Sequence, residues 1–187
     1  MEDKCIPAFT EFVKSQYQKD QERKERQRNR DLRANLETKS SVESKLQVEI
    51  NKIVRLIDRG HNCISSGRPL GENYNAGHFY SVGSNPAIRF HLLNIWGQSI
   101  SDNQHKGGKP IEYAQNLEAI YGSGFRKEVE SLSKIQLLSL SKEEIRGYIK
   151  MTKGIVKRLK QETRAYTNHE RLSIRRELNK ELGIYEQ

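Results

Sequence analysis

The spacing of apolar residues predicts a first amphipathic helix from Val42 to Arg59. Ser40 and Glu43 form a capping-box pattern before it, and Gly60 supplies a C-terminal stop. Its core-facing side is predicted from residues that recur at helical spacing, namely Val42, Leu46, Ile50, Ile53, Val54 and Ile57. The start signal, the stop signal and the periodicity agree, so this helix is expected to anchor the core.

Three more helices are expected after residue 109. One begins at Pro110, which suits a first turn, and stops at Gly122. Another follows the capping box of Ser141 and Glu144, with its apolar stripe interrupted at Gly154. A last helix is expected after Asn168, with apolar residues at Leu172, Leu178 and Leu182. The last two helices also carry a basic face, which is usually solvated and sometimes contacts DNA, formed by Lys150, Lys153, Lys157, Arg158, Lys160, Arg171, Arg175, Arg176 and Lys180.

Between Asn62 and Pro110 the pattern changes to short apolar pieces separated by glycine, serine and asparagine. Two of these pieces, Gly77 to Val82 and Ile88 to Phe90, suit short strands. Trp96 and Phe90 are interpreted as core residues, with stacking on an unpaired base as the alternative. The middle of the chain is therefore expected to be a small mixed module between helices.

The segment from Lys14 to Arg33 is polar and mostly basic, without a repeating apolar position. It is either a solubilising tail or a nucleic-acid-binding arm, because closely spaced cations release counterions when they bind phosphates. The candidate DNA contacts in it are Arg23, Lys24, Arg26, Arg28 and Arg30.

Charge narrows the class of partner. The 187 residues suit one domain with extensions, and they carry a net charge of +9. A pI near 9.5 favours polyanions, of which nucleic acid is the commonest inside cells, with an anionic membrane surface as the weaker alternative. The sequence shows neither a membrane-spanning apolar run nor a secretion signal, so the cytoplasm is the expected location. Cys5 and Cys63, the two cysteines of the chain, are expected to be free thiols.

Candidate chemistry is concentrated between Cys63 and Lys106. His78, Asn94 and Asn103 stand at the relative positions of the base, the scaffold asparagine and a metal ligand in an HNH nuclease. The usual second half of that motif, N-x4-C-x2-C-[NH]-x2-K, contains two cysteines that share a zinc ion with an earlier C-x2-C. Here three of the four cysteines are replaced, by Ser66, Ser99 and Asp102. Hydroxyl groups are poor zinc ligands, so we expect no structural zinc, and hydrogen bonds or packing in its place.

The run CISSGRPLGENYNAGHFYSVGSNPAIRFHLLNIWGQSISDNQHKGG resembles the core of the phage recombination endonucleases called NinG or Rap. Their hallmarks are a CISCG-type start, a DAGHY-type strand, an RFN-type turn and a CNQHKSGN-type helix. The resemblance implies a metal-dependent endonuclease that acts on branched recombination intermediates such as four-way junctions and D-loops, in the cytoplasm of a bacterial host.

Carried over to this sequence, the resemblance makes His78 the general base, Asn94 the loop-fixing asparagine and Asn103 a metal ligand. His105 becomes a second candidate ligand or a phosphate contact. Arg89 and Lys106 become phosphate contacts, a role for which Arg has suitable two-pronged donor geometry.

Two departures from the family pattern affect the metal site. Gly77 stands where many HNH enzymes have an acidic or His ligand, and Asn75 stands where the family has an acidic residue. A lone amide attracts a hard cation less than a carboxylate does. Asp102 is a candidate replacement ligand, with helix capping as its alternative role.

The fold class expected from these features is α+β: a small ββα-metal module of the HNH or His-Me finger type within a mainly helical protein. We expect a basic arm over residues 1–40, a nuclease core with its leading helix over 41–122, and a helical extension over 123–187. The cofactor would be one Mg²⁺ or Mn²⁺, and the partners branched DNA and a second copy of the chain, without a membrane. The alternatives are a branched- or single-stranded-DNA-binding protein with a degenerate HNH fold, and a virion or adaptor protein.

Overall fold

The computed structural model describes residues 5–137 and 139–185, which fall into two units, Met1–Ser41 and Val42–Gln187. The first unit contains α1 (Cys5–Leu36), a helix of 32 residues. Its described side chains are almost all exposed, and pairs four residues apart join along its surface, such as Lys24 with Asp20 at 2.9 Å and Arg26 with Glu22 at 3.3 Å. These pairs give the polar sequence local helical support without a core.

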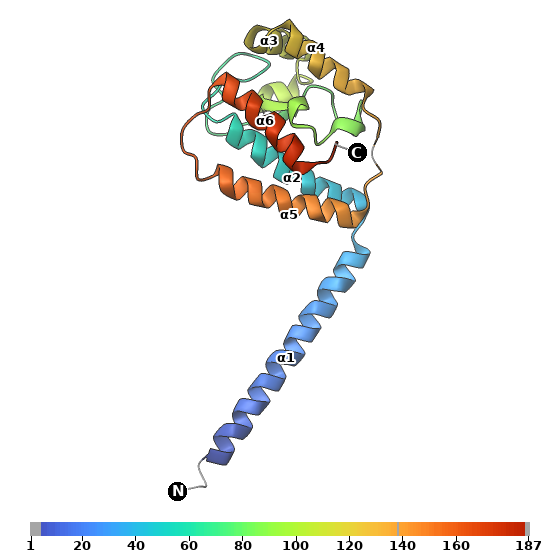
Figure 1. The fold of residues 1–187 in the computed structure, drawn as a ribbon, viewed down its shortest axis with the longest axis vertical. Coiled ribbons are helices and arrows are strands. Elements are labelled where there is room, and N and C mark those ends of the chain that lie inside the picture. The colour runs from blue at the N-terminus through green and yellow to red at the C-terminus, as the bar shows by residue number, and fades with distance from the viewer. Residues whose placement is uncertain (1–4, 138, 186–187) are drawn as a thin grey trace. The chain divides into compact units, whose positions relative to one another are not determined.

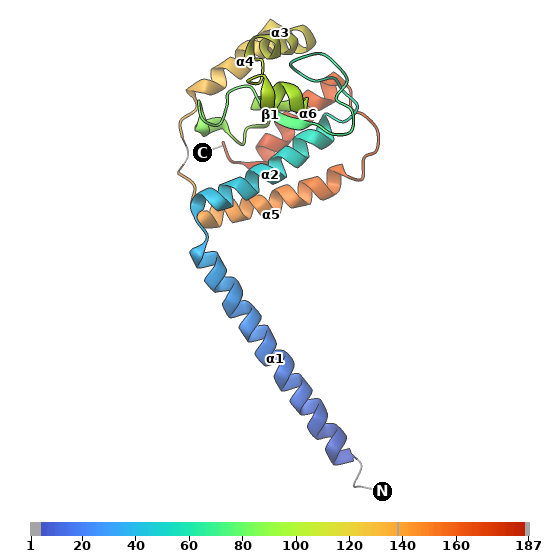
Figure 2. The same ribbon diagram turned by 180° about the vertical axis from the view of Figure 1, so that it is seen from behind.

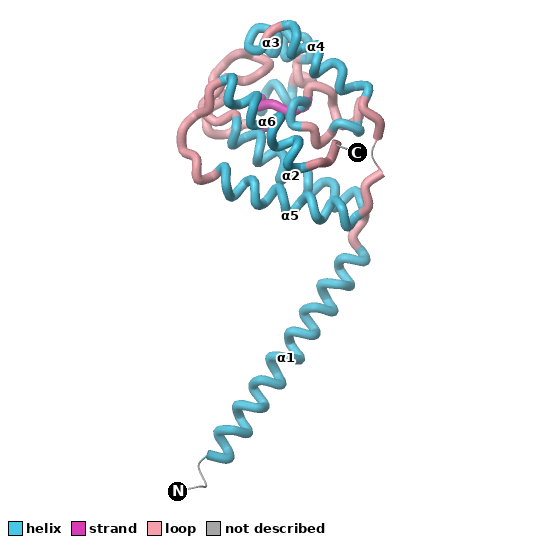
Figure 3. The backbone as a smooth tube through the Cα atoms, in the orientation of Figure 1, coloured by secondary structure: helices cyan, strands magenta, loops and turns pink. Residues whose placement is uncertain are grey.

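The second unit is a mainly helical assembly around a two-stranded sheet (Figure 1). Its regular helices are α2 (Lys39–Ile57), α3 (Pro110–Tyr121), α4 (Ser123–Ser131), α5 (Lys142–Leu159) and α6 (Asn168–Leu182). The strands β1 (Asn75–His78) and β2 (Ile95–Gln98) pair antiparallel, with Asn75 opposite Gln98 and His78 opposite Ile95. The short helical turns are η1 (Pro86–Ile88), η2 (Leu92–Asn94), the π-helical η3 (Ser101–His105) and η4 (Leu132–Lys134). An α+β architecture with a small sheet is therefore confirmed (Figure 3).

Two apolar clusters hold this unit together. One joins α2 to α5 and α6 through residues such as Leu46, Ile155 and Leu178. The other joins the hairpin to α3 and α4 through residues such as Trp96, Leu117 and Val129. Figure 2 shows α2 between the hairpin and α5, and the first cluster also includes Ala76 and Ile95 of the hairpin.

The predicted caps are confirmed in part. Ser141 accepts a hydrogen bond from the backbone N–H of Glu144 and completes the predicted box, and Thr167 with Glu170 makes a second box before α6. The predicted start of the first helix was wrong by three residues. Thr38 Oγ1 accepts from the N–H of Ser41 at 3.2 Å, so α2 begins at Lys39 and not at Val42, and it ends at Ile57 rather than at Arg59.

Gly154, where the apolar stripe is interrupted, is exposed within the continuous helix α5. Two further details differ from the predictions. The strand predicted from Gly77 to Val82 lies instead at Asn75–His78. Ile88 to Phe90 is not a strand: Pro86 opens a helical turn there, and the second strand is the later Ile95–Gln98. A fully buried strand of four residues has no alternation of polar and apolar positions, so the pattern did not reveal it.

Candidate functional site

The hairpin places His78 and Asn94 beside each other in the fold. His78 ends β1, and Asn94 directly precedes β2. The Asn94 side chain is fully buried; its Oδ1 accepts from the N–H of Tyr80 at 2.9 Å, and its Nδ2 donates to the carbonyls of Tyr80 at 3.1 Å and Ile88 at 3.3 Å. One amide therefore ties the chain after β1 to the turn before β2. These are the contacts that a loop-fixing asparagine needs.

The same loop orients the His78 ring. Its Nε2 lies 3.0 Å from the carbonyl oxygen of Arg89, and its Nδ1 has no partner among the described residues. A carbonyl can only accept, so Nε2 carries the hydrogen and Nδ1 keeps its lone pair. Burial lowers the pKa of His78, and the nearby Arg89 charge also lowers it, against the opposing effect of the Arg89 carbonyl. A neutral imidazole with a free lone pair is therefore the stable form near pH 7.

The Arg89 side chain has a protein partner. Its Nη1 donates to Glu43 Oε2 on α2 at 3.1 Å, and its guanidinium lies 4.9 Å from the centre of the Phe90 ring. The Arg89 side chain is only 19% exposed. A phosphate contact by Arg89 stays a prediction. It would require the guanidinium to bind phosphate in addition to Glu43, or in its place.

The four positions that hold zinc in the HNH motif converge here, and we call them the knuckle: Cys63, Ser66, Ser99 and Asp102. The Cys63 thiol donates to Asp102 Oδ2 at 3.4 Å, and the Ser99 hydroxyl donates to the same oxygen at 2.7 Å. The backbone N–H groups of Ser66 and Ser99 donate to Cys63 Sγ at 3.5 and 3.2 Å. Hydrogen bonds thus join the two halves of the knuckle, as expected from its sequence.

The Asp102 carboxylate is the negative centre of the knuckle. Burial alone raises its pKa, but hydrogen bonds from Ser99, Ser66 and Cys63 and the charge of Lys109 lower the pKa well below the ordinary range. Its Oδ1 lies 3.7 Å from Lys106 Nζ and 3.6 Å from Lys109 Nζ. Asp102 therefore remains ionised, with both oxygens facing donors. It lies within η3 rather than before it, so it does not cap that turn.

The remaining metal candidates lie on η3. Asn103 is partly exposed, and no side-chain hydrogen bond is described for it; His105 is exposed. The described residues contain no group of three or more His, Cys, Asp or Glu side chains that could hold a metal ion. The available donors are thus mainly a neutral amide and an imidazole, a set that fits a divalent ion when substrate phosphate supplies the negative charge.

Gln98 is a buried residue that no sequence pattern marks as part of the site. Its Nε2 donates to the Ser65 hydroxyl at 2.5 Å and to the Gly108 carbonyl at 2.6 Å, while its Oε1 is buried without a partner among the described residues. A Cβ at Gly77 would lie 1.9 Å from that Oε1. Gln98 therefore fills the space next to Gly77, the position where many HNH enzymes have a ligand side chain.

Most of the chain matches a known protein family. The family model described as "Bacteriophage Lambda NinG protein" matches residues 7–162. The chain belongs to the NinG family. It is 35% identical to "Protein ninG" of Enterobacteria phage H19B and 34% identical to the proteins of that name from Escherichia phage lambda and Salmonella phage P22, in each case over 85 residues. This match covers 46% of the chain and 42% of each relative. No solved structure matches the chain.

In this NinG-family chain, a buried ion cluster joins the hairpin to the helices. Asp58, at the end of α2, accepts from Arg171 Nε at 2.9 Å, from Arg175 Nη2 at 2.7 Å and from the N–H of Gly97 at 2.6 Å. The Arg175 guanidinium lies 3.7 Å from the centre of the Trp96 ring. The interpretation of Trp96 as core is confirmed, because its side chain is fully buried.

The basic face predicted for the last helix was wrong at two positions, because Arg171 and Arg175 are buried against Asp58. The signal that could have shown this is Asp58 itself, a carboxylate next to the apolar face of α2 that needs a partner when buried.

The predicted DNA contacts of the N-terminal segment lie on α1 and are exposed. Arg23 and Lys24 pair with Asp20 at 3.4 and 2.9 Å, whereas Arg28 and Arg30 have no described partner. No described helix is long and apolar enough to span a bilayer.

Proposed function

We propose that this NinG-family protein is a metal-dependent endonuclease that cuts branched DNA during phage recombination, in the cytoplasm of the bacterial host. The observation that supports this function is the arrangement of His78: its Nε2 donates to the Arg89 carbonyl, its Nδ1 is free, and its loop is tied by Asn94. A neutral, oriented imidazole is the group that phosphodiester hydrolysis needs as a general base.

In the proposed reaction, His78 Nδ1 takes a proton from the attacking water. The hydrogen bond from Nε2 to the Arg89 carbonyl then helps to stabilise the imidazolium, because that bond strengthens when the ring becomes positive. The oxygen of the water forms the new bond to phosphorus while the bond to the leaving oxygen breaks in line. The lowered pKa of His78 keeps the base available below its ordinary titration range.

One Mg²⁺ or Mn²⁺ would neutralise charge on the scissile phosphate and on the leaving oxygen. The side chains proposed to hold it are Asn103 and His105 on η3, with Asp102 as a third candidate that would have to exchange its hydrogen bond with Ser99. Lys106, which is half exposed beside Asp102, is proposed to contact phosphate, and so is Arg89. A pair of chains would suit the two-fold symmetry of a four-way junction.

A second candidate function is favoured by the space beside Gly77. Gln98 occupies the position of a ligand side chain there, and Asn75 replaces an acidic residue. A protein that binds branched DNA without cutting it would tolerate both changes.

The deciding experiment is cleavage of a labelled four-way junction and a matched duplex in Mg²⁺, Mn²⁺ and EDTA. We expect metal-dependent nicks at the junction from the wild type, and binding without cutting from His78→Ala. His169→Ala, which removes an exposed histidine, is the matched control and should cut like the wild type. If the wild type binds the junction and cuts in neither metal, the protein is the non-cutting binder; if His78→Ala cuts normally, His78 is not the base.

A further inference from the structure

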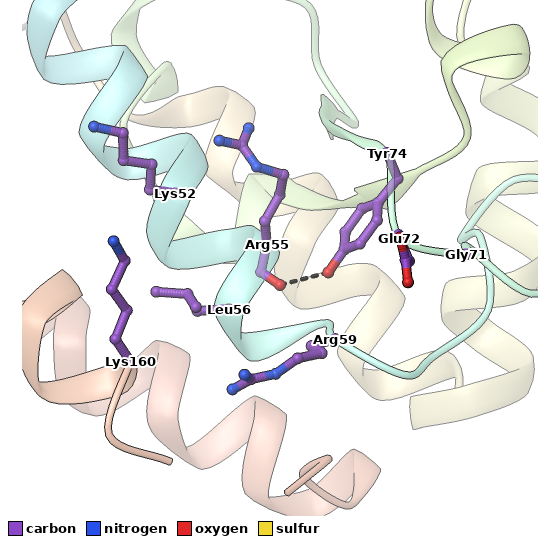
Figure 4. A pocket seen from close by; sticks show the side chains of 8 residues that line it. All are labelled: Lys52, Arg55, Leu56, Arg59, Gly71, Glu72, Tyr74 and Lys160. Carbon is purple, nitrogen blue, oxygen red and sulfur yellow. Dashed lines mark hydrogen bonds between the residues drawn. The ribbon is translucent and has the colours of Figure 1, made fainter. Parts of the chain in front are cut away.

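A groove of about 520 Å³ lies between the C-terminal half of α2, the loop before β1 and the end of α5 (Figure 4). It is lined by Lys52, Arg55, Leu56, Arg59, Gly71, Glu72, Tyr74 and Lys160. None of these residues belongs to the knuckle, to η3 or to the surroundings of His78. The groove is therefore a separate surface feature of the second unit.

The groove is basic. Its lining contains four cations and one acid, Glu72, and Lys52 pairs with Glu49 at 2.8 Å. Counting both acids, the four positive charges leave a net charge of +2. Arg59 Nη2 donates to the Glu162 carbonyl at 2.6 Å, which fixes that side chain without neutralising it. The charges of Arg55 and Lys160 have no partner among the described residues.

A hydrogen bond joins two sides of the groove. The Tyr74 hydroxyl donates a hydrogen bond to the Arg55 carbonyl, which links the loop before β1 to α2 (Figure 4). Burial raises the pKa of Tyr74 to about 12, so the hydroxyl stays neutral and keeps this bond at ordinary pH. The cations of α2 are thus displayed on a preformed surface rather than on a mobile loop.

The positive charge continues beyond the groove along α5. Lys153, Lys157 and Lys160 are exposed and lie on one face of that helix, at positions i, i+4 and i+7. Seven residues of helix span about 10 Å. Figures 1 and 2 both show α5 beside α2, so these rows of cations belong to neighbouring helices. A linear array of phosphates matches such rows better than a compact anion does.

We infer that this groove and the adjoining face of α5 bind the phosphate backbone of a DNA arm. The inference rests on the proposed function only in taking DNA as the polyanion. Tyr74 directly precedes β1 and His78 ends it, so the backbones of these two residues are roughly 13 Å apart along the strand, at a rise of about 3.3 Å per residue. DNA held there would be positioned by contacts separate from those at the cutting site.

The test is DNA binding by the full chain in EDTA, which separates it from cleavage. The groove variant combines Arg55→Gln with Lys160→Gln. The control combines Lys127→Gln with Lys134→Gln, two exposed lysines on α4 and η4 without a described partner, and it changes the net charge equally. Fluorescence anisotropy with a labelled junction at several salt concentrations gives the affinity and its salt dependence.

We expect the groove variant to bind about ten- to sixtyfold more weakly near 0.1 M salt, and its log–log salt slope to fall by about 1.8, because two phosphate contacts are lost. The control should change affinity less than about twofold, and a charge-preserving pair, Arg55→Lys with Lys160→Arg, should restore binding. Equal loss in the groove and control variants, or loss in neither, would overturn the inference. The inference would also be overturned if pyrophosphate or ATP bound at the groove more tightly than DNA and displaced it. Failure of the wild type to cut in metal, with these binding results intact, would overturn the endonuclease proposal alone.

Discussion

Replacing Asp58 with Asn removes the single negative charge of a buried cluster that contains two arginines. The Asp58 and Arg175 side chains are fully buried, and that of Arg171 is 3% exposed. Asp58 accepts hydrogen bonds from both guanidinium groups and from the N–H of Gly97. Breaking a buried pair by removing one partner typically costs about 3–5 kcal/mol, because the remaining charge is left unpaired. We expect a loss in that range, which is a large part of the stability of an ordinary domain.

Urea denaturation followed by circular dichroism would measure the change. The matched control is Arg176→Gln, which lies on α6 with Arg171 and Arg175 and removes an exposed pair with Glu128. Exposed pairs contribute at most about 1 kcal/mol, so the control should change little. Arg171→Met should cost less than Asp58→Asn, because it leaves Asp58 paired with Arg175 and lowers the excess positive charge.

The pH dependence gives an independent check. Burial raises the pKa of Asp58, but attraction to Arg175 and Arg171 and the hydrogen bonds from Arg175 and Gly97 outweigh it, so the pKa is below its ordinary value. The stabilisation is then complete above about pH 4, and it is lost as the pH falls through the lowered pKa. The difference in the free energy of unfolding between wild type and Asp58→Asn should therefore become smaller only at acid pH. A loss of under 1 kcal/mol at pH 7, or a greater loss from Arg171→Met, would refute the reasoning.

Three more predictions concern the candidate site. The cleavage rate should reach half of its plateau below pH 6.5, because burial lowers the pKa of His78; a half-point above pH 7 in a pH–rate profile would contradict this. Gly77→Ala should destabilise the fold by about 1–3 kcal/mol in thermal denaturation, since its Cβ would overlap the Gln98 amide, and Gln98→Ser should relieve part of that loss. Changing the three non-cysteine positions of the knuckle to Cys should create a zinc site, seen as one bound zinc per chain and a melting temperature that falls with chelator; a folded variant without zinc would show that the four positions do not converge.

The sequence predicts helices well where local signals agree. Ser141 and Glu144 define the start of α5 by contacts within one turn, and Pro110 and Gly122 bracket α3. The convergence of the knuckle was expected from its match to the zinc positions of the HNH motif, and the hydrogen bonds between its two halves agree with that expectation. The features that depend on contacts between neighbouring residues were therefore largely predicted correctly.

The contacts that depend on distant partners could not be predicted in the same way. Arg171 and Arg175 look like solvent-facing charges on a helix, and their partner Asp58 is more than a hundred positions earlier. The strand Ile95–Gln98 is buried throughout, so it lacks the alternation that marks a strand. Gln98 is selected only by the space beside Gly77, which exists once the hairpin has formed.

The hydrogen-bonded knuckle changes what a chelator does to this protein. Where zinc holds such a knuckle, strong chelation removes a structural ion and a catalytic ion together, and loss of cutting cannot be assigned to either. Here Cys63 is the single thiol among four positions joined by hydroxyl, thiol and carboxylate contacts. We therefore expect chelation to leave the fold intact and to act on the proposed catalytic ion alone, and oxidation has no second thiol within the knuckle with which to close a disulfide. On this reasoning, the supply of folded molecules is expected to be independent of cellular zinc.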